Sequence, residues 1–139
     1  MPERRQSLIL VDSSVWIDYY HPKGPDTIKR KIQEALAQGS VATIGLIAVE
    51  VLQGAPSPAA LATLREDFLG LQWLNLTQAV WLEAARLGST LRQHGTSIPT
   101  TDIVIAASAI HYHARLWHRD DDFTRLAHHI PALHATLLS

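Results

Sequence analysis

Short, continuous apolar runs alternate along the chain with longer segments in which apolar residues recur every three or four positions. Leu8–Val11 is a run of the first kind, typical of a strand buried in a parallel sheet. Residues 77–94 show the helical spacing of one buried face. The alternation predicts an α/β fold with a parallel sheet covered by helices on both faces. We predict strands at 8–11, 41–43, 72–74, 115–118 and 135–138, and helices at 15–20, 26–38, 44–53, 57–69, 77–94, 102–113 and 120–127.

Residues that favour helix ends mark several of these boundaries. Asp26 and Thr77 stand at the start of periodic segments and are predicted to cap their helices, and Pro58 suits a first helical position. Gly39 and Gly95 follow periodic segments and are predicted to end them.

The composition is typical of one globular domain, predicted over residues 1–139, with 47% hydrophobic and 18% charged residues. No stretch approaches the roughly 20 apolar residues that cross a bilayer, so we expect no membrane association and, by default, a cytoplasmic protein. The absence of cysteine excludes disulfides and thiolate ligands. The formal charge of −1 gives no global attraction to nucleic acid, although a bound divalent cation would attract a phosphate locally.

Four acids stand where a predicted strand ends or where a predicted helix passes through apolar residues: Asp12, Glu50, Asp102 and Asp120. Carboxylates in apolar surroundings are costly unless they are paired, protonated or bound to a metal ion. Glu50 is the hardest to explain otherwise, because it lies between two valines and has no Lys or Arg within ten residues. Since several carboxylates brought together repel one another, a divalent cation is the ordinary remedy. The pattern therefore predicts a metal site.

Each acid alone has a simpler interpretation. Asp12 and Asp102 are also suited to capping a helix or complementing its dipole, and the run 120–122 is typical of a solvated capping turn. Zinc is disfavoured, because His111 and His113 are two residues apart and would point about 200° from each other on a helix. Oxygen ligands suit Mg²⁺ or Mn²⁺, and such ions support hydrolysis of a phosphodiester.

Two other phosphate chemistries fit the chain less well. Receiver domains and aspartate-nucleophile phosphatases need a lysine late in the fold, whereas the lysines here all lie in the first quarter, the last of them at Lys31. No glycine-rich phosphate loop is present. A metal-dependent phosphatase of small molecules remains an alternative that substrate screening would test.

The helix predicted after Asp12 carries four large side chains. Trp16 and Ile17 are predicted to pack in the core, because apolar residues at helical spacing usually face inward. Tyr19 and Tyr20 are candidates for a surface that meets RNA or a protein partner.

Four segments, in this order, resemble those of the PIN-domain ribonucleases, and specifically the VapC-type toxins of toxin-antitoxin pairs. Each contains one of the four acids, and from the opening strand of the first to the end of the last they span residues 8–127. The segments are Val11–Asp18, Ile47–Gly54, Ile98–Ala107 and Leu116–Ala127.

The resemblance implies a three-layer α/β/α sandwich with a central, mostly parallel sheet. It implies Asp12 and Asp102 as the principal metal ligands, with Glu50 and Asp120 completing the cluster and positioning or activating water. Ser13, Ser14 and Asp122 are possible accessory residues, and the fourth acid stays open between Asp120 and Asp122. The implied activity is Mg²⁺- or Mn²⁺-dependent endonucleolytic cleavage of RNA, often tRNA or rRNA. The implied partners are a cognate antitoxin and a second copy of the chain, and the alternative is a catalytically silent PIN-like binding module.

Overall fold

A five-stranded parallel sheet forms the centre of the computed structural model, which describes residues 7–139. The first six residues, part of the predicted domain, lie outside that range. The strand order is β3-β2-β1-β4-β5, and each strand differs from its predicted range by one residue or none. The strands are β1 (Ile9–Val11), β2 (Val41–Thr43), β3 (Gln72–Trp73), β4 (Arg115–His118) and β5 (Ala135–Leu137).

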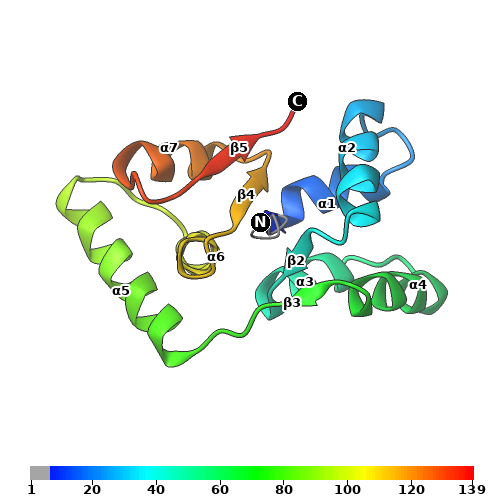
Figure 1. The fold of residues 1–139 in the computed structure, drawn as a ribbon, viewed down its shortest axis with the longest axis horizontal. Helices are drawn as coiled ribbons and strands as arrows, with labels where there is room; N and C mark the ends of the chain where they lie inside the picture. The colour runs from blue at the N-terminus through cyan, green and yellow to red at the C-terminus, as the bar shows by residue number, and fades with distance from the viewer. Residues whose placement is uncertain (1–6) are drawn as a thin grey trace, which may run out of the picture.

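Helices cover both faces of this sheet. Figure 1 shows α1, α2 and α4 on one side and α5, α6 and α7 on the other, so the predicted three-layer α/β/α architecture is confirmed. No helix within residues 7–139 combines the length and the apolar character needed to cross a membrane. The helices of this part of the chain are α1 (Ser13–Tyr20), α2 (Asp26–Ala37), α3 (Gly45–Leu52), α4 (Pro58–Leu69), α5 (Gln78–Gln93), α6 (Thr100–His111) and α7 (Asp121–His129).

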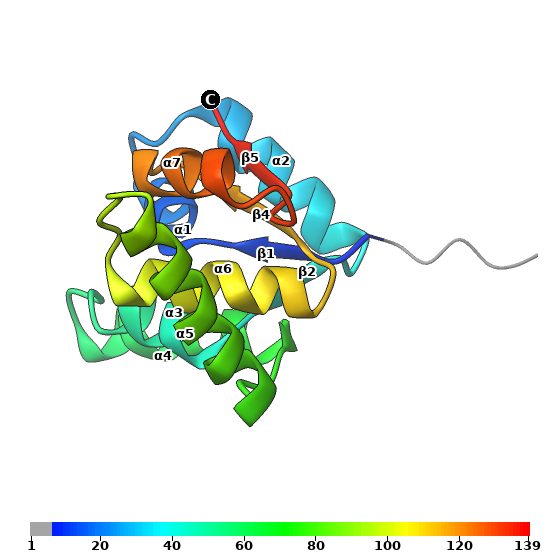
Figure 2. The same ribbon diagram turned by 90° about the vertical axis from the view of Figure 1, so that its left-hand side faces the viewer.

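The order of the strands creates a switch point between β1 and β4. From β1 the chain builds β2 and then β3 on one side, and it then returns to place β4 on the other side of β1 (Figure 2). In open parallel sheets, ligands bind outside the carboxyl ends of the strands at such a reversal. Asp12 directly follows β1 and Asp120 follows β4, so both acids lie at this point.

The longest helix, α5, fixes the position of α6. Its buried residues are those that the periodicity predicted, namely Val80, Ala84, Leu87 and Leu91. They pack against α6, in which seven of the twelve residues are buried. A helix that is apolar nearly all round belongs in the interior of a protein. The buried body of α6 therefore fixes the position of its first turn, which contains Asp102.

One predicted N-cap is wrong, and another is confirmed in position only. The N-cap position of α2 belongs to Pro25, and Asp26 is the first residue inside the helix, where its charge complements the dipole. Thr77 does hold the N-cap position of α5, but its side chain makes no capping hydrogen bond. Gly39 and Gly95 have φ angles of 68° and 71°, which confirms them as helix terminators.

The prediction that Ile17 packs in the core is also wrong, since 58% of it is exposed. Trp16, Tyr19 and Tyr20 share the inner face of this short helix, and Ile17 lies about 100° beyond Trp16 on the outer face. The Trp16 ring centroid is 5.7 Å from that of Tyr19 and 5.9 Å from that of Tyr20. The Tyr20 hydroxyl donates to Asp67 (2.9 Å). Both tyrosines are therefore partly used in packing α1 against its neighbours.

Candidate metal centre

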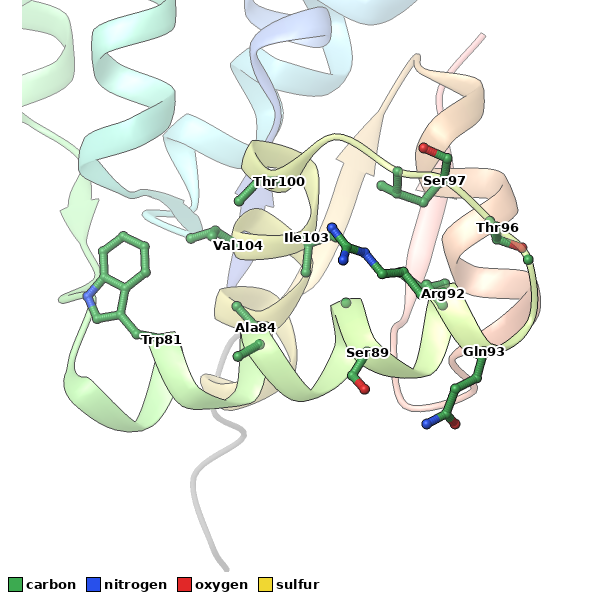
Figure 3. A pocket seen from close by; sticks show the side chains of 15 residues that line it. Trp81, Ala84, Ser89, Arg92, Gln93, Thr96, Ser97, Thr100, Ile103 and Val104 are labelled. Atoms are coloured by element: carbon green, nitrogen blue, oxygen red, sulfur yellow. The ribbon is translucent and has the colours of Figure 1, made fainter.

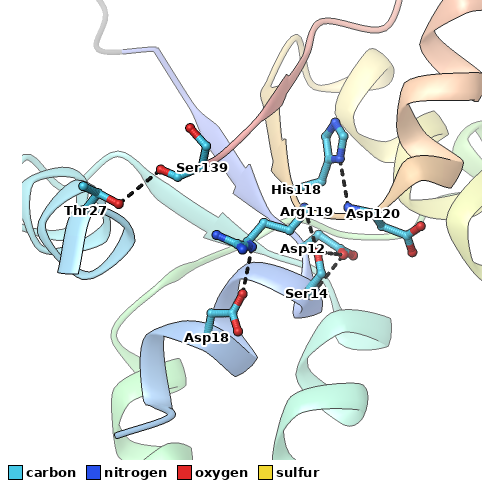
Figure 4. Close-up of polar contacts among 8 residues, drawn as sticks. All are labelled: Asp12, Ser14, Asp18, Thr27, His118, Arg119, Asp120 and Ser139. Atoms are coloured by element: carbon cyan, nitrogen blue, oxygen red, sulfur yellow. Dashed lines mark hydrogen bonds and ion pairs between the residues drawn. The ribbon is translucent and has the colours of Figure 1, made fainter. Parts of the chain in front are cut away.

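Asp12 stands where β1 passes into α1 and is fixed there by hydrogen bonds. Its Oδ2 accepts from the backbone N–H of Ser14 (3.1 Å) and from the Ser14 hydroxyl (2.6 Å), so Asp12 caps α1 as predicted. The Ser14 Oγ in turn accepts from the backbone N–H of Arg119 beyond β4 (3.0 Å; Figure 4). Only 3% of Asp12 is exposed. Because both donors reach Oδ2, the other oxygen of this buried carboxylate is left for a ligand.

Asp120 and Asp122 lie at the start of α7, beyond the neighbouring strand. Asp120 is the N-cap, and its Oδ1 accepts from the backbone N–H of Asp122 (2.9 Å). The backbone N–H of Asp120 donates to Nδ1 of the buried His118 (3.3 Å; Figure 4). Asp122 forms an ion pair with Arg125 one helical turn later. The turn after β4 is thus held by its own hydrogen bonds in a form that presents two carboxylates.

Asp102, in the first turn of α6, meets these two acids. One carboxylate oxygen from each of Asp102, Asp120 and Asp122 lies within 4.8 Å of the other two. Burial, with repulsion from Asp120 and Asp12 next, raises the pKa of Asp102 to about 7, and a hydrogen bond with Asp122 adds to the effect. A carboxyl group with so high a pKa favours its proton in the absence of a cation, and a bound divalent ion would reverse that preference.

Glu50 approaches the same region from α3, which packs against α1. Burial and, after it, the negative charge of Asp12 raise the pKa of Glu50. Its Oε1 is buried and has no hydrogen-bond partner within residues 7–139. A buried carboxylate oxygen without a partner is costly in a folded protein, so this atom points to a ligand that completes the site.

The residues present fit a divalent cation of the hard type. The candidate ligands are carboxylate oxygens from four separate elements, and oxygen ligands are what Mg²⁺ and Mn²⁺ prefer. The mutual repulsion that raises the pKa of Asp102 and the unpartnered Oε1 of Glu50 are both relieved by positive charge. The region therefore has the chemistry of an acidic metal centre.

One oxygen each from Asp102, Asp120 and Asp122 forms a compact group. Asp12 and Glu50 lie outside that group, although the charge of Asp12 raises the pKa of both Asp102 and Glu50. Asp120 and Asp122 both place a carboxylate oxygen in this group, and the neighbouring Asp121 is exposed. Ser14 links Asp12 to the end of β4, whereas Ser13 makes no side-chain hydrogen bond within the described residues.

Two arginines beside these acids were missed by the sequence analysis. Arg119 pairs with Asp18 of α1 (2.8 Å; Figure 4), a contact between distant segments that spacing does not reveal. Arg125 could have been found, because it follows Asp122 by three residues on a predicted helix.

A hollow of about 890 Å³ lies elsewhere, between α5 and α6. Its lining includes Trp81, Ile103 and Val104 but none of the five acids (Figure 3). The acids are therefore grouped at the sheet edge, outside that hollow.

The fold and the acids define a class of protein: three-layer α/β/α chains with a carboxylate centre at the switch point of a parallel sheet. The family model described as PIN domain matches residues 9–129. This chain therefore belongs to the PIN-domain family.

Curated relatives and solved structures agree with this assignment. The chain is 34% identical over 125 residues to VapC ribonuclease Mb1587 of Mycobacterium bovis, covering 86% of this chain and 92% of that protein. Among solved structures, VapBC2 from Rickettsia felis, bound to a DNA fragment from its promoter, aligns with a TM-score of 0.78 at 20% identity, covering 95% and 99% of the two chains. VapC20 of Mycobacterium tuberculosis, described as a sarcin-ricin-loop-cleaving toxin, aligns with a TM-score of 0.66 at 17% identity over 84% and 93%.

Proposed function

We propose that this chain is a metal-dependent endoribonuclease and the toxin of a VapBC-type toxin-antitoxin pair. The observation that carries the proposal is the convergence of Asp102, Asp120 and Asp122 oxygens within 4.8 Å, beside the buried Asp12 and the unpartnered Oε1 of Glu50. The similarity to proteins named VapC ribonucleases supports RNA as the substrate. Because the proposed substrate is cellular RNA, the proposed location of the protein is the cytoplasm.

The proposed cofactor is Mg²⁺ or Mn²⁺, held by Asp12, Asp102, Asp120 and Asp122. When bound, such a cation supplies positive charge to a phosphodiester and lowers the pKa of water. Ser14 supports the site by fixing the Asp12 carboxylate through Oδ2. Arg125, one helical turn later on α7, orients the Asp122 carboxylate through an ion pair.

Glu50 is the proposed acceptor of the proton that attacking water releases. A general base works best when its pKa approaches the working pH, and burial and Asp12 both raise the pKa of Glu50. Its free Oε1 can accept a hydrogen bond from water without first breaking one within the described residues.

The proposed protein partner is a cognate antitoxin that covers an apolar surface beside α3, the helix that carries Glu50. Val49, adjacent to Glu50, is 61% exposed, and with Leu61 and Trp73 it lines a hollow of about 770 Å³. Leu61 is 41% exposed and Trp73 47% exposed. Apolar side chains grouped in this way mark surfaces that bind other proteins.

A second copy of the chain is the other proposed partner. Trp81 and Leu82, at the start of α5, are 47% and 65% exposed, and Trp and Leu side chains on one helix suit a homodimer interface. Sedimentation analysis of the antitoxin-free protein tests this assembly. A dimer that the change Leu82→Glu converts to a monomer supports it, and a wild-type monomer at micromolar concentration contradicts it.

Cleavage of RNA by antitoxin-free protein tests the activity. Total RNA and purified tRNA are incubated with the protein and Mg²⁺ or Mn²⁺, alongside EDTA and Asp12→Ala controls. Discrete products with a 5′-phosphate and a 3′-hydroxyl, absent from both controls, are expected. A folded, metal-loaded protein that cleaves neither RNA would favour the silent binding module, and release of phosphate from small phosphomonoesters would favour the phosphatase.

A further inference from the structure

A second polar feature lies beside the acids, between α7 and the loop that joins α5 to α6. It is a hollow of about 570 Å³, here named the basic hollow. No carboxylate from residues 7–139 lines it. Its polar side chains are Thr96, Ser97, Thr124, Arg125, His128 and His129.

Arg125 joins the basic hollow to the acid cluster. Its Nη2 donates to the backbone carbonyl of Ser97 (3.2 Å) and pairs with Asp122. Its Nε and Nη1 groups make no hydrogen bond within residues 7–139, and half of the side chain is exposed. An arginine has five N–H donors in a planar fork that suits phosphate, so this residue is fixed at one end and has donors to spare at the other.

The two walls of the basic hollow are tied together. The Thr96 Oγ1 and the His129 Nε2 are 3.1 Å apart, and the His129 ring stacks on His94 at a centroid distance of 5.1 Å. Histidines in the last turn of a helix also complement its dipole. This interaction with the helix dipole does not explain why Arg125 and the hydroxyls of Thr96 and Ser97 also line the basic hollow.

The basic hollow lies along α7 from the acids. At about 1.5 Å per residue, Asp122 and His128 are about 9 Å apart along the helix axis. An extended nucleic-acid strand at the acid cluster would therefore carry its next phosphates past Arg125. The acids repel a phosphodiester backbone wherever no cation neutralises them, so a positive neighbouring surface is needed to hold the strand.

We propose that the basic hollow binds a backbone phosphate of the RNA substrate next to the phosphate that is cleaved. This inference rests on the proposed nuclease function and assigns its substrate-positioning surface. Arg125 provides the charge, and His128 and the threonine hydroxyls provide further hydrogen bonds. Binding there would also explain why Arg125 contacts Asp122, since one side chain then aligns both the metal ligand and the RNA strand.

Salt-dependent RNA binding tests the basic hollow. All proteins carry Asp12→Asn, which keeps a capping oxygen but prevents cleavage, and a fluorescent single-stranded RNA is titrated with Mg²⁺ present at several NaCl concentrations. Arg125→Gln should weaken binding by about tenfold and reduce the salt slope by about 0.7, the contribution of one phosphate contact to single-strand binding. Arg125→Lys should restore the slope. Arg65→Gln, which removes an exposed charge on α4, should leave both quantities unchanged.

Four results would overturn the proposal or separate it from the nuclease function. Arg125→Gln with unchanged affinity and slope contradicts the basic hollow. Arg125→Lys without recovery of the slope does so too, because the loss would then come from a disturbed Asp122. Cleavage of the same RNA by the chain without Asp12→Asn decides the nuclease function separately. A wild-type chain that neither binds nor cleaves RNA refutes both.

Discussion

Replacing Asp102 by Asn should stabilise the metal-free protein while removing one of its ligands. Asp102 is only 9% exposed and lies close to Asp120 and Asp122. Its pKa rises from 3.8 to about 7 on folding, so the folded state keeps the proton to higher pH than the unfolded chain does. Ionisation of this group therefore opposes folding, and the cost grows from about pH 4 to about pH 7 and is constant above that.

The size of this cost follows from the two pKa values. Each pKa unit corresponds to about 1.4 kcal/mol, so a difference of about 3 gives about 4 kcal/mol in full. Burial is the larger cause of the difference, and solvent at the partly exposed Asp120 and Asp122 screens the repulsive part, which leaves roughly 2 kcal/mol. Asp102→Asn should raise the free energy of unfolding by that amount at pH 8 and by almost nothing at pH 4.

Urea denaturation in EDTA at pH 4, 6 and 8 measures the difference. Asp26→Asn is the matched control, because Asp26 also lies in the first turn of a helix but is exposed and outside the acid cluster. It should cost about 0.3–1 kcal/mol through lost interaction with the helix dipole. An Asp102→Asn protein that is less stable than wild type at pH 8, or whose gain does not depend on pH, would refute the electrostatic reasoning.

Two further changes test the framework around the acids, both by urea denaturation. Ser14→Ala should lower the free energy of unfolding by about 1–2 kcal/mol, because it removes the hydrogen bond to Asp12 and leaves the Arg119 N–H without its acceptor. The control Ser13→Ala should change the free energy of unfolding by less than about 0.5 kcal/mol. Equal effects of the two changes would contradict the bridging role of Ser14. Phe123→Ala should cost about 3–5 kcal/mol, because this fully buried ring packs on His118, and a cost below about 1 kcal/mol would show that the turn after β4 does not depend on that packing.

Local patterns were sufficient to predict most of the fold. The apolar run Leu8–Val11 and the spacing of the buried residues in α5 are local signals. Each shows which residues of its strand or helix are buried in the core. The positions of Asp12 and Asp120 at strand ends were predictable for the same reason, since neighbouring parallel strands end at one edge of a sheet.

Features that depend on tertiary contacts could not be predicted in this way. The bond between Ser14 and Arg119 joins residues 105 positions apart, and no spacing rule connects them. Ile17 looked apolar enough for the core, but the short helix has room for only one inner face. The sequence already named Asp122 as a candidate, but its position beside Asp120 depends on the cap geometry at the first turn of α7, which no spacing rule supplies.

The most direct test of the metal-nuclease site is the single-turnover rate of RNA cleavage as a function of Mg²⁺ concentration. The comparison is between wild type and two variants that each lose one carboxylate. Asp102→Asn removes it from inside the acid cluster, and Asp121→Asn removes it from an exposed position outside the cluster. We expect Asp102→Asn to abolish cleavage with the fold intact, and Asp121→Asn to stay within about twofold of wild type. Full activity of Asp102→Asn, or cleavage that persists in EDTA, would contradict a metal centre at these acids.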